Sequence, residues 1–144
     1  MGVQVDGTFY DDYYFAPHFQ QAGYTVGVFG KHLNGDNPNC PPPGVDVWLA
    51  NGGGNYWSPQ FAWATSGGTS QSVQFNNCSD LGGPCYSTTV IADTALNWLQ
   101  RLNDTKTTHQ EAPRKPFFAY VAFKAPHIQD GPGWPVPLPE KQYV

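Results

Sequence analysis

The amino-acid sequence predicts an α/β fold: a mixed or parallel sheet flanked by helices and connected by long loops rich in proline and glycine. Two short apolar runs predict buried strands, and an amphipathic stretch lies between them, an order typical of α/β architecture. The chain has 14 Pro and 16 Gly, about a fifth of its 144 residues, and these indicate long connecting segments. Ligands of such sheets bind beyond the carboxyl ends of the strands, so we expect functional residues there.

The first half of the chain predicts one short helix and two strands. Residues 11–24 predict the helix, since proline is tolerated in a first turn and glycine commonly ends a helix. Residues 24–29, YTVGVF, are β-branched and aromatic, as expected for a buried strand. From Lys31 to about Gln60 we expect a long loop, because clusters of glycine and proline interrupt this segment. Residues 72–75 predict an edge strand.

The second half predicts a helix and a strand. Residues 87–102 place most of their apolar side chains on one stripe at helical spacing. Residues 115–123, KPFFAYVAF, form an apolar run, which predicts a strand buried on both faces. A proline-rich loop follows this run. Lys31 and the segment Lys124-Ala125-Pro126-His127 therefore both lie just after a predicted strand.

The composition excludes several classes of protein. Only 12% of the residues are charged, but 5 Trp, 8 Tyr and 9 Phe supply enough apolar surface for a core. The net charge of −4 and the lack of Lys/Arg clusters argue against a nucleic-acid binder. No run approaches about 18 consecutive apolar residues, so no membrane span is predicted, and residues 1–10 do not resemble a signal peptide.

Cysteines and glycosylation sequons favour the secretory pathway. Cys78 and Cys85 bracket a short loop with two glycines and a proline, and a disulfide between them is plausible in a secreted protein. Cys40 stands apart, and its pairing is left open. Asn77 and Asn103 each begin an Asn-x-Ser/Thr sequon and are candidate glycosylation sites.

Lys31 directly follows Gly30 at the end of a predicted strand, a position that suggests an anion ligand. A phosphate-binding P-loop is excluded, because Thr25 stands where its first glycine would be and His32 replaces its Ser or Thr. His127 follows a proline, which constrains the backbone of that segment. Two such side chains converging on one crevice would fit a sulfate or phosphate ester. The sequence contains neither zinc-ligand spacings nor the nucleophile elbow of serine hydrolases.

Four stretches of the sequence resemble motifs of the formylglycine-dependent sulfatases. They are FQQAGYTVGVFGKHLN (19–34), NYW (55–57), YSTTVIADTALNWL (86–99) and KPFFAYVAFKAPHIQ (115–129). The ending Gly-Lys-x-Leu-Asn of the first stretch is closest to the branch of N-acetylglucosamine-6-sulfatases and extracellular heparan endosulfatases. The resemblance implies an internal part of the N-terminal catalytic domain with a partial alkaline-phosphatase-like fold. It also implies hydrolysis of sulfate esters on a sulfated sugar or glycosaminoglycan.

The resemblance implies roles for individual residues. Lys31 would bind a sulfate oxygen, and His127 would contact the sulfate or protonate the departing alcohol oxygen, which makes both catalytic. Asn34 and Lys124 would contribute to substrate binding. His32 is a further candidate for substrate binding, at a position where the branch usually has Tyr.

The implied chemistry also needs groups that the sequence lacks. In the family, a formylglycine hydrate attacks the sulfur; it is made from a cysteine by the formylglycine-generating enzyme and is oriented by a calcium ion. None of the three cysteines stands in the Cys-x-Pro/Ala-Ser-Arg motif, and Asp11-Asp12 precede a helix instead of following a strand as calcium ligands should. We therefore expect residues 1–144 to be a single, incomplete catalytic domain, inactive alone, of a longer extracellular or lysosome-like enzyme.

Three alternatives stay open at this point. A phosphoester hydrolase of the same fold would use Thr or Ser as its nucleophile. A non-catalytic glycan-binding module would use the Trp- and Tyr-rich loops of residues 48–63. A truncated product without function would fail to fold alone.

Overall fold

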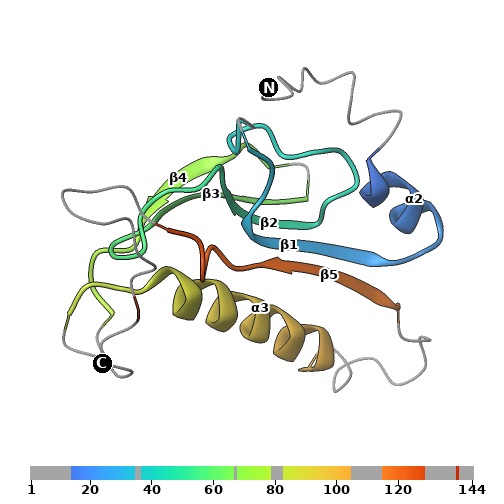
Figure 1. Ribbon diagram of the computed structural model, residues 1–144. Coiled ribbons are helices and arrows are strands. Elements are labelled where there is room, and N and C mark those ends of the chain that lie inside the picture. Colours follow the sequence, from blue (N-terminus) through green and yellow to red (C-terminus); the bar gives the residue numbers. More distant parts are fainter. Residues whose placement is uncertain are drawn as a thin grey trace.

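The computed structural model forms a five-stranded mixed sheet with helices on its two faces (Figure 1). It describes residues 14–34, 37–66, 68–78, 83–104, 115–128 and 139. Its elements are α2 (Phe15–Gln21), β1 (Thr25–Lys31), β2 (Val47–Asn51), β3 (Gln60–Thr65), β4 (Gln71–Gln74), α3 (Ser87–Asp104) and β5 (Phe117–Ala122). The strand order is β4-β3-β2-β1-β5. The predicted α/β fold class is confirmed.

β1 lies between two parallel neighbours. It pairs with β2 from Gly27↔Val47 to Lys31↔Asn51, and with β5 from Thr25↔Phe117 to Gly30↔Ala122. β3 and β4 extend the sheet by antiparallel pairing on the far side of β2. The three parallel strands therefore end at one common edge of the sheet.

Alternating side chains of β1 enter two separate apolar clusters. Phe29 packs with Leu49 and with α3 residues, including Ile91 and Trp98. Val28 points to the opposite face and packs with Trp48 and the alanines of β2 and β3. Figure 1 shows α3 along one face of the sheet and α2 beside β1. Because each face of β1 is covered, its apolar run is buried almost throughout.

Most of the elements expected from the sequence are present, with shifted ends. The predicted strand 24–29 is β1, which continues to Lys31, and the predicted edge strand 72–75 is β4. The predicted helix 87–102 is α3, which ends at Asp104. The helix expected in 11–24 is α2, and residues 11–13 of that range lie outside the described residues. No helix within the described residues is both long and apolar enough to cross a membrane.

The prediction of one long loop from Lys31 to about Gln60 is wrong. The segment contains all of β2, and β3 begins at its end. Val47–Asn51 is a short apolar run, and pairing with β1 on one side and β3 on the other stabilises it as a strand. The prolines and glycines that suggested a loop lie before and after this run.

The prediction that the last strand is buried on both faces is also wrong. Within the described residues, β5 has one strand neighbour, β1, and forms an edge of the sheet. Phe117 is 52% exposed and Val121 is 40% exposed. An apolar run identifies a strand but does not say whether a second strand lies beside it.

Gly30 allows β1 and β5 to approach each other directly before Lys31. Its φ is +103°, and a Cβ atom there would lie 2.0 Å from the carbonyl oxygen of Ala122. Gly23, at the end of α2, has a similar φ of +86°, but a Cβ atom there would meet nothing within 4 Å. Substitution of either glycine would strain the backbone. Only substitution of Gly30 would also cause a steric clash.

We therefore expect Gly30→Ala to destabilise the fold much more than Gly23→Ala. Backbone strain at a positive φ costs about 1–3 kcal/mol in either variant. Only Gly30→Ala must also push β5 away from β1. Urea unfolding of both variants measures the difference, and equal losses of unfolding free energy would contradict the close approach.

Candidate functional site

Four of the five predicted site residues lie at the carboxyl edge of the parallel strands. Lys31 is the last residue of β1 and is in register with Asn51, the last residue of β2. Asn34 follows three residues later. β5 ends at Ala122, and the loop that leaves it carries Lys124 and His127. The parallel pairing of β1 with β2 and β5 thus brings these side chains to one edge of the sheet.

Lys31 and Asn34 contact each other. The Lys31 Nζ donates a hydrogen bond of 2.6 Å to Oδ1 of Asn34. Lys31 is half-buried and Asn34 is exposed. The hydrogen bond directs the ammonium group along the loop at the end of β1, where it remains accessible to an anion.

Lys124 is held against the turn that follows β2. Its Nζ donates a hydrogen bond to the carbonyl oxygen of Gly54 and lies 4.8 Å from the ring centroid of Tyr56. A cation over an aromatic face is stabilised by the ring quadrupole. The second lysine of the site is therefore fixed by a backbone acceptor and an aromatic ring.

His127 presents its imidazole to solvent in a defined tautomer. Its backbone N–H donates to the Lys124 carbonyl over 2.9 Å, and its carbonyl accepts a hydrogen bond from the Tyr56 hydroxyl. Nδ1 lies 2.6 Å from the carbonyl oxygen of Ile128. Because a carbonyl oxygen only accepts, Nδ1 carries the proton, and Nε2 is the nitrogen available to a ligand.

His32 lies apart from the other four. It is only 9% exposed, and its Nε2 is 3.0 Å from the Tyr14 hydroxyl. The imidazole lies edge-on to Trp48, with 5.0 Å between ring centroids. These contacts place it among the aromatic side chains of the core, a position that favours a structural role over contact with a substrate.

Tyr56 is a site residue that the sequence analysis did not identify. Its side chain is fully buried, and its ring stacks on Tyr86 with centroids 5.6 Å apart. Its carbonyl accepts a 2.7 Å hydrogen bond from the Ser87 N–H at the start of α3. Together with its contacts to the β5 loop, these bonds join three segments of the chain. In the sequence, its only signal is the NYW stretch (55–57), which does not indicate these distant contacts.

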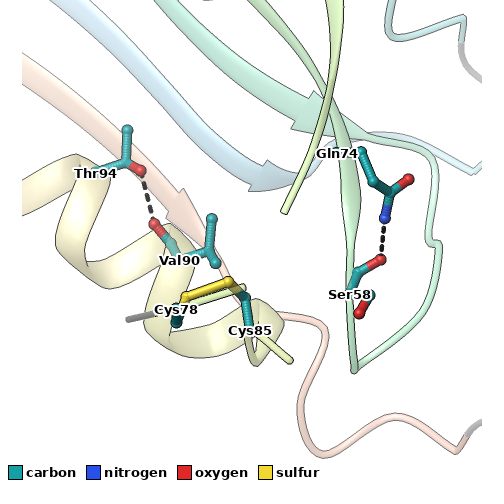
Figure 2. The surroundings of a disulfide bond; sticks show 6 residues. All are labelled: Ser58, Gln74, Cys78, Cys85, Val90 and Thr94. Atoms are coloured by element: carbon teal, nitrogen blue, oxygen red, sulfur yellow. Dashed lines mark hydrogen bonds between the residues drawn. A yellow bond between two sulfur atoms is a disulfide. The ribbon is translucent and has the colours of Figure 1, made fainter. Parts of the chain in front are cut away.

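A disulfide joins Cys78 to Cys85 just before α3 (Figure 2). The Cys85 side chain lies in the same apolar cluster as Phe29, so the bridge anchors the start of α3 to the core. Cys40 is exposed and carries a free thiol. The side chains of Asn77 and Asn103, the two sequon asparagines, are exposed.

The described residues do not fit the calcium and formylglycine sites of the implied chemistry. They contain no group of three or more His, Cys, Asp or Glu side chains that could hold a metal ion. Asp11 and Asp12 lie outside the described residues. Two of the cysteines form the disulfide, and Cys40 is followed by three prolines.

We expect Tyr56→Phe to change how stability depends on pH. Burial, followed by the neighbouring Tyr86, raises the pKa of the Tyr56 hydroxyl above its ordinary value of about 10. Between these two values the unfolded chain loses the proton first, so the free energy of unfolding falls as pH rises through the alkaline range. The variant lacks this contribution and also loses about 1 kcal/mol at neutral pH with the hydrogen bond to His127.

Urea unfolding between pH 8 and about pH 11 tests this expectation. The unfolding free energy should fall less steeply in Tyr56→Phe than in the unaltered chain. Identical slopes in the two proteins would show that the hydroxyl is not held in its neutral form by the fold.

Comparisons with known proteins found relatives of this chain in sequence and in structure. The sulfatase family model matches residues 11–143. An extracellular sulfatase SULF-1 homolog from Drosophila melanogaster is 28% identical over 115 residues, which are 78% of this chain and 9% of the relative. The solved structure of BT4656 in complex with its substrate D-glucosamine-2-N,6-O-disulfate is 27% identical, with a TM-score of 0.56. That match covers 86% of this chain and 20% of the solved chain.

The sequence match and the fold lead to the same assignment. The family model spans nearly the whole chain, and the fold resembles part of a solved structure whose substrate is a sulfated glucosamine. The chain therefore belongs to the sulfatase family, whose members hydrolyse sulfate esters.

Proposed function

We propose that this chain supplies the anion-binding side of a site that hydrolyses sulfate esters on a sulfated amino sugar. The observation that carries the proposal is the position of Lys31, Lys124 and His127 at one edge of the sheet. An ester sulfate is an anion, and two ammonium groups with an imidazole are suitable ligands for its oxygens.

Lys31 acts on the charge that grows on the sulfuryl oxygens in the transition state. Its ammonium group is directed by Asn34 and needs little rearrangement when the ester binds. Such preorganised donors stabilise developing charge more than flexible ones do. Lys124 is the second cation, and the hydrogen bond from its Nζ to the Gly54 carbonyl oxygen holds its ammonium group at the turn after β2.

The tautomer of His127 determines what it can contribute. With Nδ1 donating to Ile128, a neutral imidazole offers only an acceptor at Nε2. The protonated imidazole carries a hydrogen at both nitrogens, so Nε2 then donates to a sulfate oxygen or gives its proton to the departing alcohol. We assign protonated His127 to the transfer of its Nε2 proton to the departing alcohol.

The proposed substrate class rests on the two relatives. One was solved with a sulfated glucosamine as its substrate, and the other is an extracellular sulfatase. We propose a similar substrate here, a sulfated glucosamine or a glycosaminoglycan that contains it, as in N-acetylglucosamine-6-sulfatases. The disulfide and the two exposed sequon asparagines support a place in the secretory pathway.

The nucleophile and metal ligands belong, in this proposal, to parts outside the described residues. The chain spans about a tenth of the Drosophila relative and a fifth of the solved chain. We propose that a formylglycine, made by the formylglycine-generating enzyme, and a calcium ion complete the catalytic domain of the whole enzyme. The chain alone would then bind the ester without turning it over.

The alternative of a glycan-binding module with an exposed aromatic platform has less support. Trp48, Tyr56 and Phe61, from the segment that would form the platform, are each at most 1% exposed. A phosphoester hydrolase of the same fold differs in its preferred ester. Turnover rates on matched sulfate and phosphate esters distinguish the two functions, because a phosphoester hydrolase would prefer the phosphate ester.

We expect Lys31→Ala to lower sulfate ester turnover by about 100- to 1,000-fold in the complete enzyme that carries this chain. The variant removes one preorganised cation from the transition state. Lys115→Ala is the matched control, because Lys115 is exposed and lies before β5, at the opposite edge of the sheet. Near-normal turnover by Lys31→Ala, or an equal loss in the control, would contradict the assignment.

We expect His127→Gln to lose more activity on a sugar sulfate than on an aryl sulfate with a good leaving group. Glutamine preserves hydrogen bonding but cannot protonate the departing oxygen, a contribution worth about 100- to 10,000-fold where the leaving group is a poor one. Steady-state rates on both substrates measure the ratio. Equal losses would assign His127 to sulfate binding alone.

A further inference from the structure

A pocket of about 490 Å³ lies beside the candidate anion site and plays no part in the chemistry above. Its volume is within the range of about 300–1,000 Å³ that small-molecule sites occupy. The polar side chains around it are amides and hydroxyls, namely Asn39, Asn51, Asn55, Ser58, Gln60, Ser72 and Gln74. Phe61 and Ala62 add apolar surface, and none of the described lining residues is charged.

The glycine turn of residues 52–54 forms a wall that the pocket shares with the anion site. Gly54 lines the pocket, and its carbonyl oxygen accepts the hydrogen bond from Lys124. Asn51 lines the pocket and is the register partner of Lys31. Gly53 and Gly54 both have positive φ values, which favour glycine, and these two positions place no side chain in the shared wall.

The amides of the pocket are ordered before any ligand arrives. Asn51 accepts a hydrogen bond from the Gly53 N–H at 3.3 Å, which fixes the glycine turn. Gln60 Nε2 donates to the Ser72 hydroxyl over 2.6 Å. Gln74 Nε2 donates to the Ser58 carbonyl, as Figure 2 shows. The two glutamine bonds each use one of the two amide hydrogens of the side chain, and each glutamine also has an acceptor oxygen.

We infer that this pocket binds the uncharged sugar residue next to the sulfated one, so that the substrate is an oligosaccharide. Sugar hydroxyls both donate and accept hydrogen bonds, which matches amides and serine hydroxyls. An uncharged lining gives a second sulfate no cation, so the sulfated residue is directed to the lysines instead. The inference rests on the proposed function and extends it to a second sugar residue.

Binding measurements on the chain with two probes test the inference. The probes are D-glucosamine-2-N,6-O-disulfate and a disaccharide that joins this residue to an unsulfated sugar. We expect the disaccharide to bind at least about five- to tenfold more tightly, the gain from one or two added hydrogen bonds. Gln74→Ala should remove that gain and leave the monosaccharide affinity unchanged. Asn55→Ala, in the turn, provides an independent variant with the same expected result.

The controls separate this inference from the proposed function. Gln100→Ala changes an exposed glutamine of α3, outside the pocket, and should preserve the gain. Lys31→Ala should weaken both probes. The inference would be overturned if the two probes bound with equal affinity or if neither bound. It would also be overturned if the disaccharide kept its tighter binding in both pocket variants. Unchanged binding by Lys31→Ala, with the gain still lost in Gln74→Ala, would instead overturn the proposed anion site alone.

Discussion

The parallel pairing of β1 with both of its neighbours is the constraint on which the site depends. Three strands that run in the same direction end at the same edge, so segments distant in sequence meet there. Gly30 permits the closest part of this pairing, because its lack of a side chain lets the Ala122 carbonyl approach. The lysine that follows it is therefore positioned by the backbone of two strands rather than by a flexible loop.

Strand pairing alone leaves the loops beyond the strands unfixed, and Tyr56 supplies the remaining order. Its hydroxyl binds the His127 carbonyl, its ring lies under Lys124, and its own carbonyl accepts from Ser87. A buried ring makes many dispersion contacts and loses little conformational freedom when it is ordered. Lys124 and the backbone of His127 are thus held by an uncharged residue, which does not compete with an anion for the lysine.

The sequence predicted the elements that a local pattern determines, and it failed to predict the features that depend on long-range contacts. The apolar runs and the helical stripe predicted β1 and α3, and glycine followed by lysine pointed to the strand end. β2 was missed because proline and glycine clusters flank a short run that is stable only between two partners. Tyr56 contacts a residue 71 positions away in the chain, and such a contact has no local signature. The pocket likewise combines residues of several elements and could not be seen in any one segment.

Among the acidic residues that the structure describes, Asp46 and Asp104 lie away from the anion site that we propose. Asp46, at the amino end of β2, accepts hydrogen bonds from the Val26 N–H and the Ser66 hydroxyl, so its charge is satisfied at the opposite edge. Asp104, the last residue of α3, also lies away from the site, because α3 begins next to Tyr56. The positive end of the helix dipole is accordingly on the side of Lys31 and Lys124. The net charge of −4 would repel a sulfate ester at long range, so the proposed site has to attract the ester through its nearby cations and the helix dipole. In the proposed function, binding of the ester then depends on close contact with Lys31 and Lys124. Screening by salt affects these contacts less than it affects the long-range repulsion.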